Sequence, residues 1–364
     1  MRRGVAGSGV TLVLLVAPLL GCSEEQVVVT ANTPPTHEAG AAPTVPVSRK
    51  LVRYVSPTGD DDNLGSRDRP WRTLKWALSR VYAGQVLYVR GGTYHETIDR
   101  FHLHQGRPDK RITVLAYPGE NPVLVGSISL RRPVNWLIDN LDVTGDPGVP
   151  ETQRASYMVK VVGGRGWTWQ NSVFTRTTGR ANVMITGWGV TEPTGFNFRG
   201  NCLHDVPEPP QGSTNLFVGP MKRFASGTVS RNVIFNYDRQ PNVRLGSGAG
   251  APTRVNLTSN TIFGGRVGIA LRGRPHHVKI RRNVVGGGFA PAEIRFPRGV
   301  SLGTSLTNNI AVNAAQLLRP KVRKTVHGSG NITLPGDPNF VDTTRCDGFR
   351  SGLDAMIPYG AFAP

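Results

Sequence analysis

Short apolar strands recur along the middle of this chain, and an asparagine closes each of them. These asparagines follow one another at intervals of 22 to 31 residues, at Asn140, Asn171, Asn201, Asn232, Asn260, Asn283, Asn309 and Asn331. A repeat of this period built from short strands predicts a coiled β-solenoid. Because stacked turns place identical side chains above one another, we expect the asparagine amides to hydrogen-bond along the stack.

Two apolar columns accompany the five asparagines from Asn201 to Asn309. Three residues before each asparagine stand Phe198, Val229, Leu257, Ile280 and Leu306. Two residues after each asparagine stand Leu203, Ile234, Ile262, Val285 and Ala311. Both columns are predicted to point into the core. Asn140 and Asn171 fit only with one apolar column shifted by a residue, and Asn331 has Gly328 in the first column.

A second strand in each turn alternates inward and outward side chains. These strands are predicted at Met158–Val162, Asn182–Thr186, Leu216–Val218, Val243–Leu245, Ile269–Leu271 and Ile294–Phe296. Alternation turns one central side chain of each strand outward. The outward residues are Lys160, Met184, Phe217, Arg244, Ala270 and Arg295. Stacking predicts that they form one outer column, with neighbouring turns about 4.8 Å apart.

The N-terminal part of the repeat region predicts a cap for the first turn. A strand is expected at residues 51–56 and a helix opening at Pro70, the favoured first helical position. One helical face would carry Trp71, Leu74, Leu78 and Val81. Such a helix would cover strand edges and core at the open end. The next strands and turns are expected at Val86–Val89, 90–94, Ile112–Ala116 and 117–122.

Several segments also carry a family resemblance. They are Tyr54–Gly59, Pro70–Leu74, Gly91–Tyr94, Ile112–Val114, Tyr117–Val123 and Asp337–Asp342. They resemble secreted right-handed parallel β-helix proteins of the pectate-lyase-like superfamily over about residues 51–342. The resemblance implies an all-β solenoid with a binding groove along one outer face. The superfamily includes lyases of acidic polysaccharides, uronate epimerases, glycosidases and surface proteins, so the fold alone does not fix the activity.

The first residues predict export and lipid attachment. Arg2 and Arg3 precede the apolar run Val10–Leu20, which is too short to span a membrane. The following Leu19-Leu20-Gly21-Cys22 resembles a bacterial lipobox, in which Cys22 is lipidated. We therefore expect a lipoprotein held on the outer face of a bacterial membrane. Its predicted parts are the signal peptide 1–21, a disordered tether 22–50, the β-helix 51–342 with its cap to about residue 95, and a tail 343–364.

The charge balance favours an acidic partner. Lys and Arg number 43 against 24 Asp and Glu, which gives a formal net charge of +19. Such an excess suits anionic polysaccharides, envelope polymers or lipid headgroups, although a solvated arginine-rich surface would look the same in the sequence. Export and the lack of an aromatic-basic motif disfavour nucleic acid.

The outer column, with Lys222, Arg223 and Arg272 that end or follow the same strands, supplies the candidate site residues. The candidates for catalysis are Lys160, Lys222 and Arg244. The candidates for substrate binding are Phe217, Arg223, Arg272 and Arg295. A polysaccharide lyase removes a proton α to a uronate carboxylate, which requires a base and a cation to neutralise that carboxylate. The resemblance implies a lysine or arginine base, often with calcium.

Metal and disulfide chemistry stay open in the sequence. Two groups of acidic residues could bind calcium, Asp60–Asp62 and the set of Asp205, Asp238 and Glu208. The alternative is that these residues only form turns. Asp139 and Asp142 flank a single turn without a partner on the next, so hydrolysis by paired carboxylates is disfavoured. Cys202 and Cys346 are expected as free thiols, with a disulfide as the alternative.

Two functions therefore remain open. The first is a monomeric lipoprotein that binds an acidic polysaccharide along a basic groove and cleaves it by β-elimination. The second is a non-catalytic β-helix surface or adhesion protein.

Overall fold

The computed structural model describes most of residues 51–364. Its gaps are 100–102, 147, 149–155, 178, 188–191, 207–212, 222–224, 237–239, 248–249, 251–253, 274, 289–292, 297–302, 314–315, 319–325, 337, 339, 341, 343–345, 349–358 and 363–364. All described residues belong to the unit Ala42–Pro364. The predicted signal peptide, tether and lipidation site Cys22 lie outside them, as do Lys222 and Arg223. No helix within the described ranges has the length and apolarity needed to cross a bilayer.

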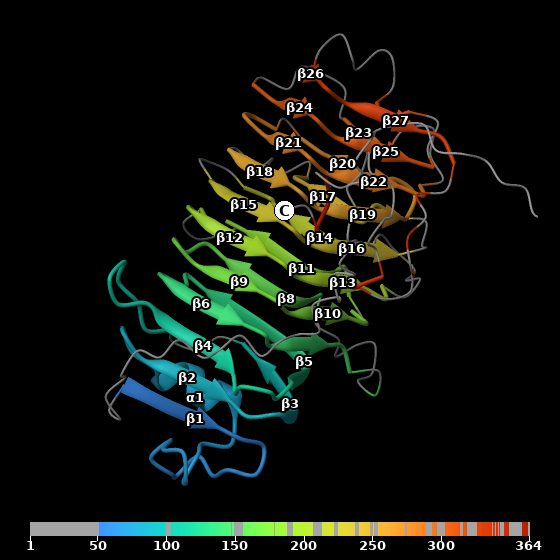
Figure 1. Cartoon of the computed structure of the whole chain (residues 1–364). Helices are drawn as coiled ribbons and strands as arrows, with labels where there is room; N and C mark the ends of the chain where they lie inside the picture. Colours follow the sequence, from blue (N-terminus) through green and yellow to red (C-terminus); the bar gives the residue numbers. More distant parts are fainter. Residues whose placement is uncertain are drawn as a thin grey trace, which may run out of the picture. The chain divides into compact units, whose positions relative to one another are not determined.

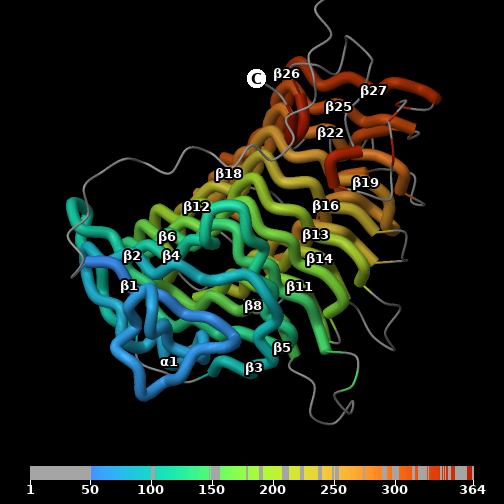
Figure 2. The backbone as a smooth tube through the Cα atoms, turned by 60° about the horizontal axis from the view of Figure 1, so that its bottom comes forward, coloured from blue at the N-terminus to red at the C-terminus, as the bar shows by residue number. Residues whose placement is uncertain are grey.

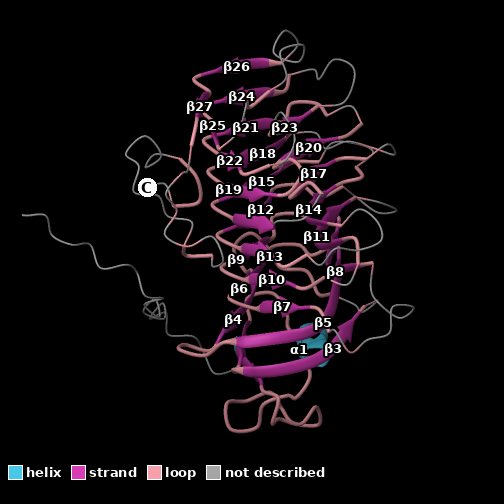
Figure 3. Cartoon of the chain, turned by 90° about the vertical axis from the view of Figure 1, so that its right-hand side faces the viewer, coloured by secondary structure: helices cyan, strands magenta, loops and turns pink. Residues whose placement is uncertain are grey.

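The strands stack as three parallel rows around one core (Figures 1 and 3). The first row is β1 (Val52–Val55), β2 (Val86–Val89), β4 (Ile112–Ala116), β6 (Trp136–Asp139), β9 (Thr168–Gln170), β12 (Phe196–Arg199), β15 (Gly227–Ser230), β18 (Val255–Thr258), β21 (Lys279–Arg281), β24 (Ser305–Thr307) and β26 (His327–Ser329). The second row is β5 (Pro122–Arg131), β8 (Tyr157–Val162), β11 (Ala181–Thr186), β14 (Thr214–Val218), β17 (Val243–Leu245), β20 (Ile269–Leu271) and β23 (Ile294–Arg295). The third row starts from the same long β5 and continues through β7 (Asp142–Thr144), β10 (Val173–Thr175), β13 (Cys202–His204), β16 (Val233–Asn236), β19 (Thr261–Gly264), β22 (Val284–Gly286), β25 (Ile310–Val312) and β27 (Ile332–Leu334). The predicted parallel solenoid is confirmed.

The two predicted apolar columns stand in register inside this stack. Phe198 pairs with Val229 in the first row, and the pairing continues through Leu257 and Ile280 to Leu306. In the third row, Leu203 starts the corresponding series that ends at Ala311. All ten side chains are buried. Because burying one such aliphatic or aromatic side chain stabilises by about 1.5–3 kcal/mol, the columns provide a continuous core along the stack.

Six of the eight asparagines form a hydrogen-bonded ladder at the corner between the first and third rows. They are Asn201, Asn232, Asn260, Asn283, Asn309 and Asn331. Each of the first five donates its backbone N–H and its side-chain N–H to the side-chain oxygen of the next, at 2.9 to 3.1 Å. Each also donates to a backbone carbonyl of the preceding turn. The predicted ladder is confirmed for these six, including the last turn.

The prediction is wrong for Asn140 and Asn171, which occupy a different corner position. Their φ angles are 55° and 54°, in the left-handed region, where Gly200 and Arg231 stand on the next turns. Ser172 holds the ladder position instead, because its backbone N–H donates to Asn201 Oδ1 at 3.1 Å. Asparagine tolerates the left-handed conformation better than most residues, so it suits the left-handed corner position as well as the ladder position. The spacing of asparagines in the sequence therefore does not distinguish the two positions.

The cap helix α1 (Leu74–Arg80) covers the N-terminal end of the stack (Figure 2). It begins four residues later than predicted, because Trp71 pairs with Val55 as an isolated bridge and Thr73 is the N-cap. Glu96 on β3 (Gly92–Ile98) accepts from the backbone N–H groups of the first turn at 2.6 and 2.9 Å. The predicted apolar face is nevertheless buried. The turn expected at 90–94 is also wrong, because its last three residues start β3, which pairs with β5.

A second amide ladder runs along the corner that leads into the second row. Asn182 donates to Asn215 Oδ1, and Asn215 donates to Asn242 Oδ1, both at 2.8 Å. The pairing register places Gly268 and then Glu293 at the same position on the next two turns. The fully buried Glu293 carboxylate fills this end of the ladder, where it accepts from Gly268 N at 3.3 Å and from Gly288 N at 3.0 Å. Burial raises its pKa to about 7, although these two hydrogen bonds oppose the shift.

Glu293 should make the fold lose stability as the pH rises from 5 to 8. The native state keeps a proton up to a pKa of about 7, whereas the unfolded chain loses it near 4.5. The stabilisation is therefore complete below pH 4.5 and is lost as the pH passes 7, by about 3 kcal/mol. Urea denaturation at pH 5 and pH 8 measures the free energy of unfolding of the wild type and of Glu293→Gln. The wild type should lose more stability between the two pH values than the variant does. An equal pH dependence in both proteins would contradict the assignment.

The C-terminal segment packs along the outside of the third row. Ala361 N donates to Thr261 Oγ1 at 3.0 Å, and Ala361 is buried in a cluster with Phe235 and Phe263. Cys346 forms a disulfide with Cys202, and their Cα atoms are 5.9 Å apart. The expectation of free thiols is therefore wrong. The 144 residues between the two cysteines hid their proximity, which depends on the tail folding back over the stack.

Candidate functional site

The predicted outer column exists and lies on the second row. Strand pairing aligns Lys160, Met184, Phe217, Arg244, Ala270 and Arg295 on successive turns. Lys160 and Arg244 are half-buried and Arg295 is exposed. The three apolar members are covered, with 4% of Met184, 7% of Phe217 and 1% of Ala270 exposed. The column is therefore a set of separated cations on an apolar floor rather than an evenly open groove.

Aromatic rings connect the cations of this column. The Arg244 guanidinium carbon lies 5.7 Å from the Phe217 ring centroid, and the Phe217 ring lies 6.4 Å from that of Tyr157. Tyr157 in turn stands under Lys160, whose Nζ is 5.6 Å from the ring centroid. The nearly buried Phe217 supports Arg244 from below, and the half-buried Tyr157 offers more of its surface to a ligand.

Two further arginines act electrostatically on Arg244. Its pKa is lowered, first because the side chain is buried and then because Arg272 and Arg180 lie near, whereas Tyr157 acts in the opposite direction. Arg272 follows β20, Arg180 precedes β11, and both are exposed. Burial and the two positive neighbours both disfavour the charged form of Arg244. Guanidinium groups bind carboxylates in two-pronged geometry, so this part of the face suits an anionic ligand.

Sequence reasoning missed Tyr157 and Arg180. Each stands at the beginning of a second-row strand, as the first residue of β8 or the residue before β11. Alternation selects central strand residues, so it passed over these ends. A search for aromatic and basic residues at strand beginnings would have found both. We call Tyr157, Lys160, Phe217, Arg180, Arg244, Arg272 and Arg295 the basic–aromatic face.

The carboxylates considered as metal or acid–base groups have structural partners. Asp61 accepts from Arg72 N and Thr73 N at 2.8 and 2.9 Å in front of α1. Asp139 accepts from Gln170 and Asn171, and Asp142 accepts from Val173 N, all at 2.8 Å. Asp205 faces His204, whereas Asp238 and Glu208 fall outside the described residues. In the described ranges no carboxylates gather as a calcium site requires, so we derive no step through calcium.

Comparison with known proteins finds partial sequence matches to curated proteins. No family model matches it. It is 29% identical to pectate lyase PEL9 of Emericella nidulans over 161 residues, which is 42% of this chain and 37% of that protein. It is 45% identical to the uncharacterized protein YwoF of Bacillus subtilis (strain 168) over 73 residues, 20% of this chain and 15% of that protein. The chain thus matches less than half the length of either curated relative.

The solved structure of pectate lyase Pel9A shares the architecture. Its TM-score with this chain is 0.58 at 14% identity, and the match covers 85% of this chain and 91% of that one. At this identity the likeness concerns the fold. Together with the parallel rows and the capped N-terminal end, it shows that the chain has the right-handed parallel β-helix fold of the pectate-lyase-like proteins.

Proposed function

We propose that this protein binds an acidic polysaccharide along the basic–aromatic face and cleaves it by β-elimination. The alignment of Lys160, Arg244 and Arg295 on one outer row of the stack is the observation that carries the proposal. Cations repeated along one row suit a polyanion, and a chain of uronates presents carboxylates at regular spacing. Two proteins that resemble this chain are named pectate lyases, which supports the same substrate class.

The spacing of the column suits an extended polymer. Lys160 and Arg244 are three turns apart, about 14 Å, and Arg244 and Arg295 are two turns apart, about 10 Å. These separations exceed one sugar unit, so each cation would meet a different carboxylate of the same polysaccharide. Tyr157 would contact a sugar ring between Lys160 and Arg244.

The proposed cleavage centres on Arg244. A base takes the proton α to the uronate carboxylate, the C–O bond at the β carbon breaks, and the product carries a carbon–carbon double bond. Arg244 and its arginine neighbours would neutralise the carboxylate as negative charge builds on it. A base must lie within hydrogen-bond reach of the proton. Lys160 is about 14 Å from Arg244 and would serve a neighbouring sugar. We therefore propose Lys222 as the base, the other lysine candidate of the sequence, which lies outside the described residues.

An ultraviolet assay tests cleavage directly. Residues 50–364 are incubated with pectate, alginate and a glycosaminoglycan, and the absorbance of unsaturated uronate is followed. Wild-type protein should form product, and Lys222→Ala should lose it while still binding. Lys160→Ala should weaken binding and keep the product, because it removes only a distant contact.

The same assay distinguishes the alternatives. Tight, salt-sensitive binding without product would support the non-catalytic surface protein. Loss of product in Lys160→Ala with full activity in Lys222→Ala would reverse the two assigned roles. Absence of binding to all three polyanions would overturn the proposed function.

We also propose that Cys22 is lipidated and anchors the protein outside the cytoplasmic membrane, acting as a monomer. The lipobox-like run that ends at Cys22 supports this. Bacteria grown with an alkyne-labelled fatty acid should incorporate the label into the wild type and not into Cys22→Ser. Equal labelling of both proteins would contradict the anchor.

A further inference from the structure

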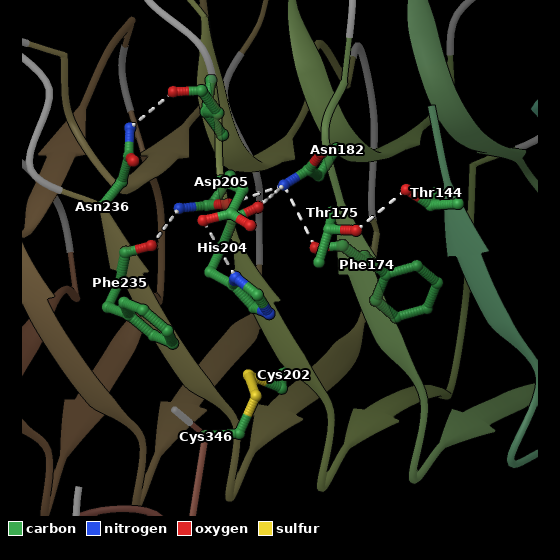
Figure 4. Close-up of polar contacts among 12 residues, drawn as sticks. Thr144, Phe174, Thr175, Asn182, Cys202, His204, Asp205, Phe235, Asn236 and Cys346 are labelled. Atoms are coloured by element: carbon green, nitrogen blue, oxygen red, sulfur yellow. Dashed lines mark hydrogen bonds and ion pairs between the residues drawn. A yellow bond between two sulfur atoms is a disulfide. The ribbon is translucent and has the colours of Figure 1, made fainter. Parts of the chain in front are cut away.

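A possible set of metal ligands lies on the third row, away from the basic–aromatic face. Cys202, His204 and Cys346 bring one ligand atom each to within 4.8 Å of one another (Figure 4). Across the described ranges this is the one group of at least three histidines, cysteines or acidic residues with such spacing. In the state shown by the structure, the two sulfur atoms are joined in the disulfide.

His204 is held in a fixed orientation beside these sulfurs. Its backbone belongs to β13, and Asn182 Nδ2 donates to its carbonyl at 2.8 Å. Its ring stacks on Phe235 at 4.9 Å between centroids, with 7° between the planes. Asp205 Oδ1 lies 3.2 Å from Nδ1. Nδ1 makes no hydrogen bond to this carboxylate, so the stacking on Phe235 fixes the ring, and Nε2 lies on the side of the cysteines (Figure 4).

We propose that the reduced form of this protein binds one zinc ion through Cys202 Sγ, Cys346 Sγ and His204 Nε2. A phosphine or dithiol reductant supplies two electrons, water or the dithiol supplies two protons, and the S–S bond breaks to give two thiols. The zinc ion then displaces both thiol protons, which leave to solvent. The two positive charges of the ion are balanced by the two negative charges of the thiolates. Binding of zinc by two thiolates and an imidazole leaves a fourth position. The His204 side chain is 18% exposed, so water can reach that position.

Two features favour a specific site over general cation binding. The chain carries a net charge of +19, so its overall field disfavours metal cations. Two thiolates balance the charge of a zinc ion, which allows it to enter a largely buried place. In the reduced protein, zinc would therefore replace the disulfide in holding the C-terminal segment against the third row.

Cobalt(II) is the spectroscopic probe for the test. The purified full-length protein is titrated with Co²⁺ before and after reduction with tris(2-carboxyethyl)phosphine, and thiolate-to-cobalt charge transfer is recorded. We expect one equivalent to bind after reduction, no such band before it, and loss of the band when Zn²⁺ is added. Asp205→Asn should weaken Co²⁺ binding about 10-fold, because it removes the negative charge 3.2 Å from the His204 ring.

Histidine variants decide whether the cluster is the site. His204→Gln keeps a planar side chain of similar size and should lose at least 10-fold in Co²⁺ affinity, whereas His95→Ala, an exposed histidine on β3, should bind as the wild type does. Several results would overturn the proposal: no cobalt band after reduction, equal binding by His204→Gln, or equal binding by the oxidised protein. Release of the reduced C-terminal segment would appear as the first of these.

Discussion

Replacing Asn260 by alanine is expected to lower the free energy of unfolding by about 4 kcal/mol. Asn260 Oδ1 accepts from the backbone and side-chain N–H groups of Asn232, and its Nδ2 donates to Asn283 Oδ1 and Val229 O. All of these groups are buried, so the variant leaves donors and acceptors without partners in the core. Denaturation in guanidinium chloride, followed by circular dichroism, measures the loss.

Asn256 supplies a matched control four residues away. It lies on β18, pairs with Thr228 and points away from the core with a half-buried side chain. Asn256→Ala should therefore change the unfolding free energy by less than about 1 kcal/mol. Similar losses in the two variants would mean that asparagine supports the strands in general, and that the ladder has no special role.

Replacing Arg244 by glutamine should weaken polysaccharide binding about 30-fold, which corresponds to about 2 kcal/mol. Arg244 is the half-buried cation between Arg272, Arg180 and the Phe217 ring, where water screens a bound carboxylate least. Isothermal titration calorimetry with the tightest-binding polyanion of the panel, at two salt concentrations, gives the affinity and its salt dependence.

Arg295→Gln is the control on the same column. Its side chain is exposed and two turns away from Arg244, so solvent and salt screen its contribution to about 1 kcal/mol or less. If the Arg295 variant binds as weakly as the Arg244 variant, the polysaccharide responds to total charge. The cluster around Arg244 would then have no distinct role.

Much of the fold could be predicted because stacking repeats a local pattern. Apolar residues three before and two after an asparagine identify the inward positions, and alternation identifies Lys160, Phe217 and Arg244 as outward on one row. Both inferences need only the alternation of side chains along a strand and a constant alignment of strands from one turn to the next. The parallel pairing of the structure follows both throughout the central turns.

The remaining features depend on contacts that no local pattern encodes. The burial of Met184 and Phe217 depends on the residues that surround the second row. Strand alternation predicts which way a side chain points, but it does not predict whether other residues bury it. The electrostatic effect of Arg180 on Arg244 acts between a strand end and the middle of another strand. The disulfide depends on the C-terminal segment returning across the stack. Distances of this kind became available only from the three-dimensional arrangement.

The constant register of the asparagine ladder has a consequence for how such a protein can diversify. Consecutive rungs from Asn201 to Asn331 are separated by 22 to 31 residues, yet every rung bonds to the next in the same way. Length differences are therefore absorbed by the connections between strands. Insertions and deletions at those bends can remodel the surface that meets a ligand while the scaffold keeps its pitch, so one backbone can acquire new specificities through small genetic changes.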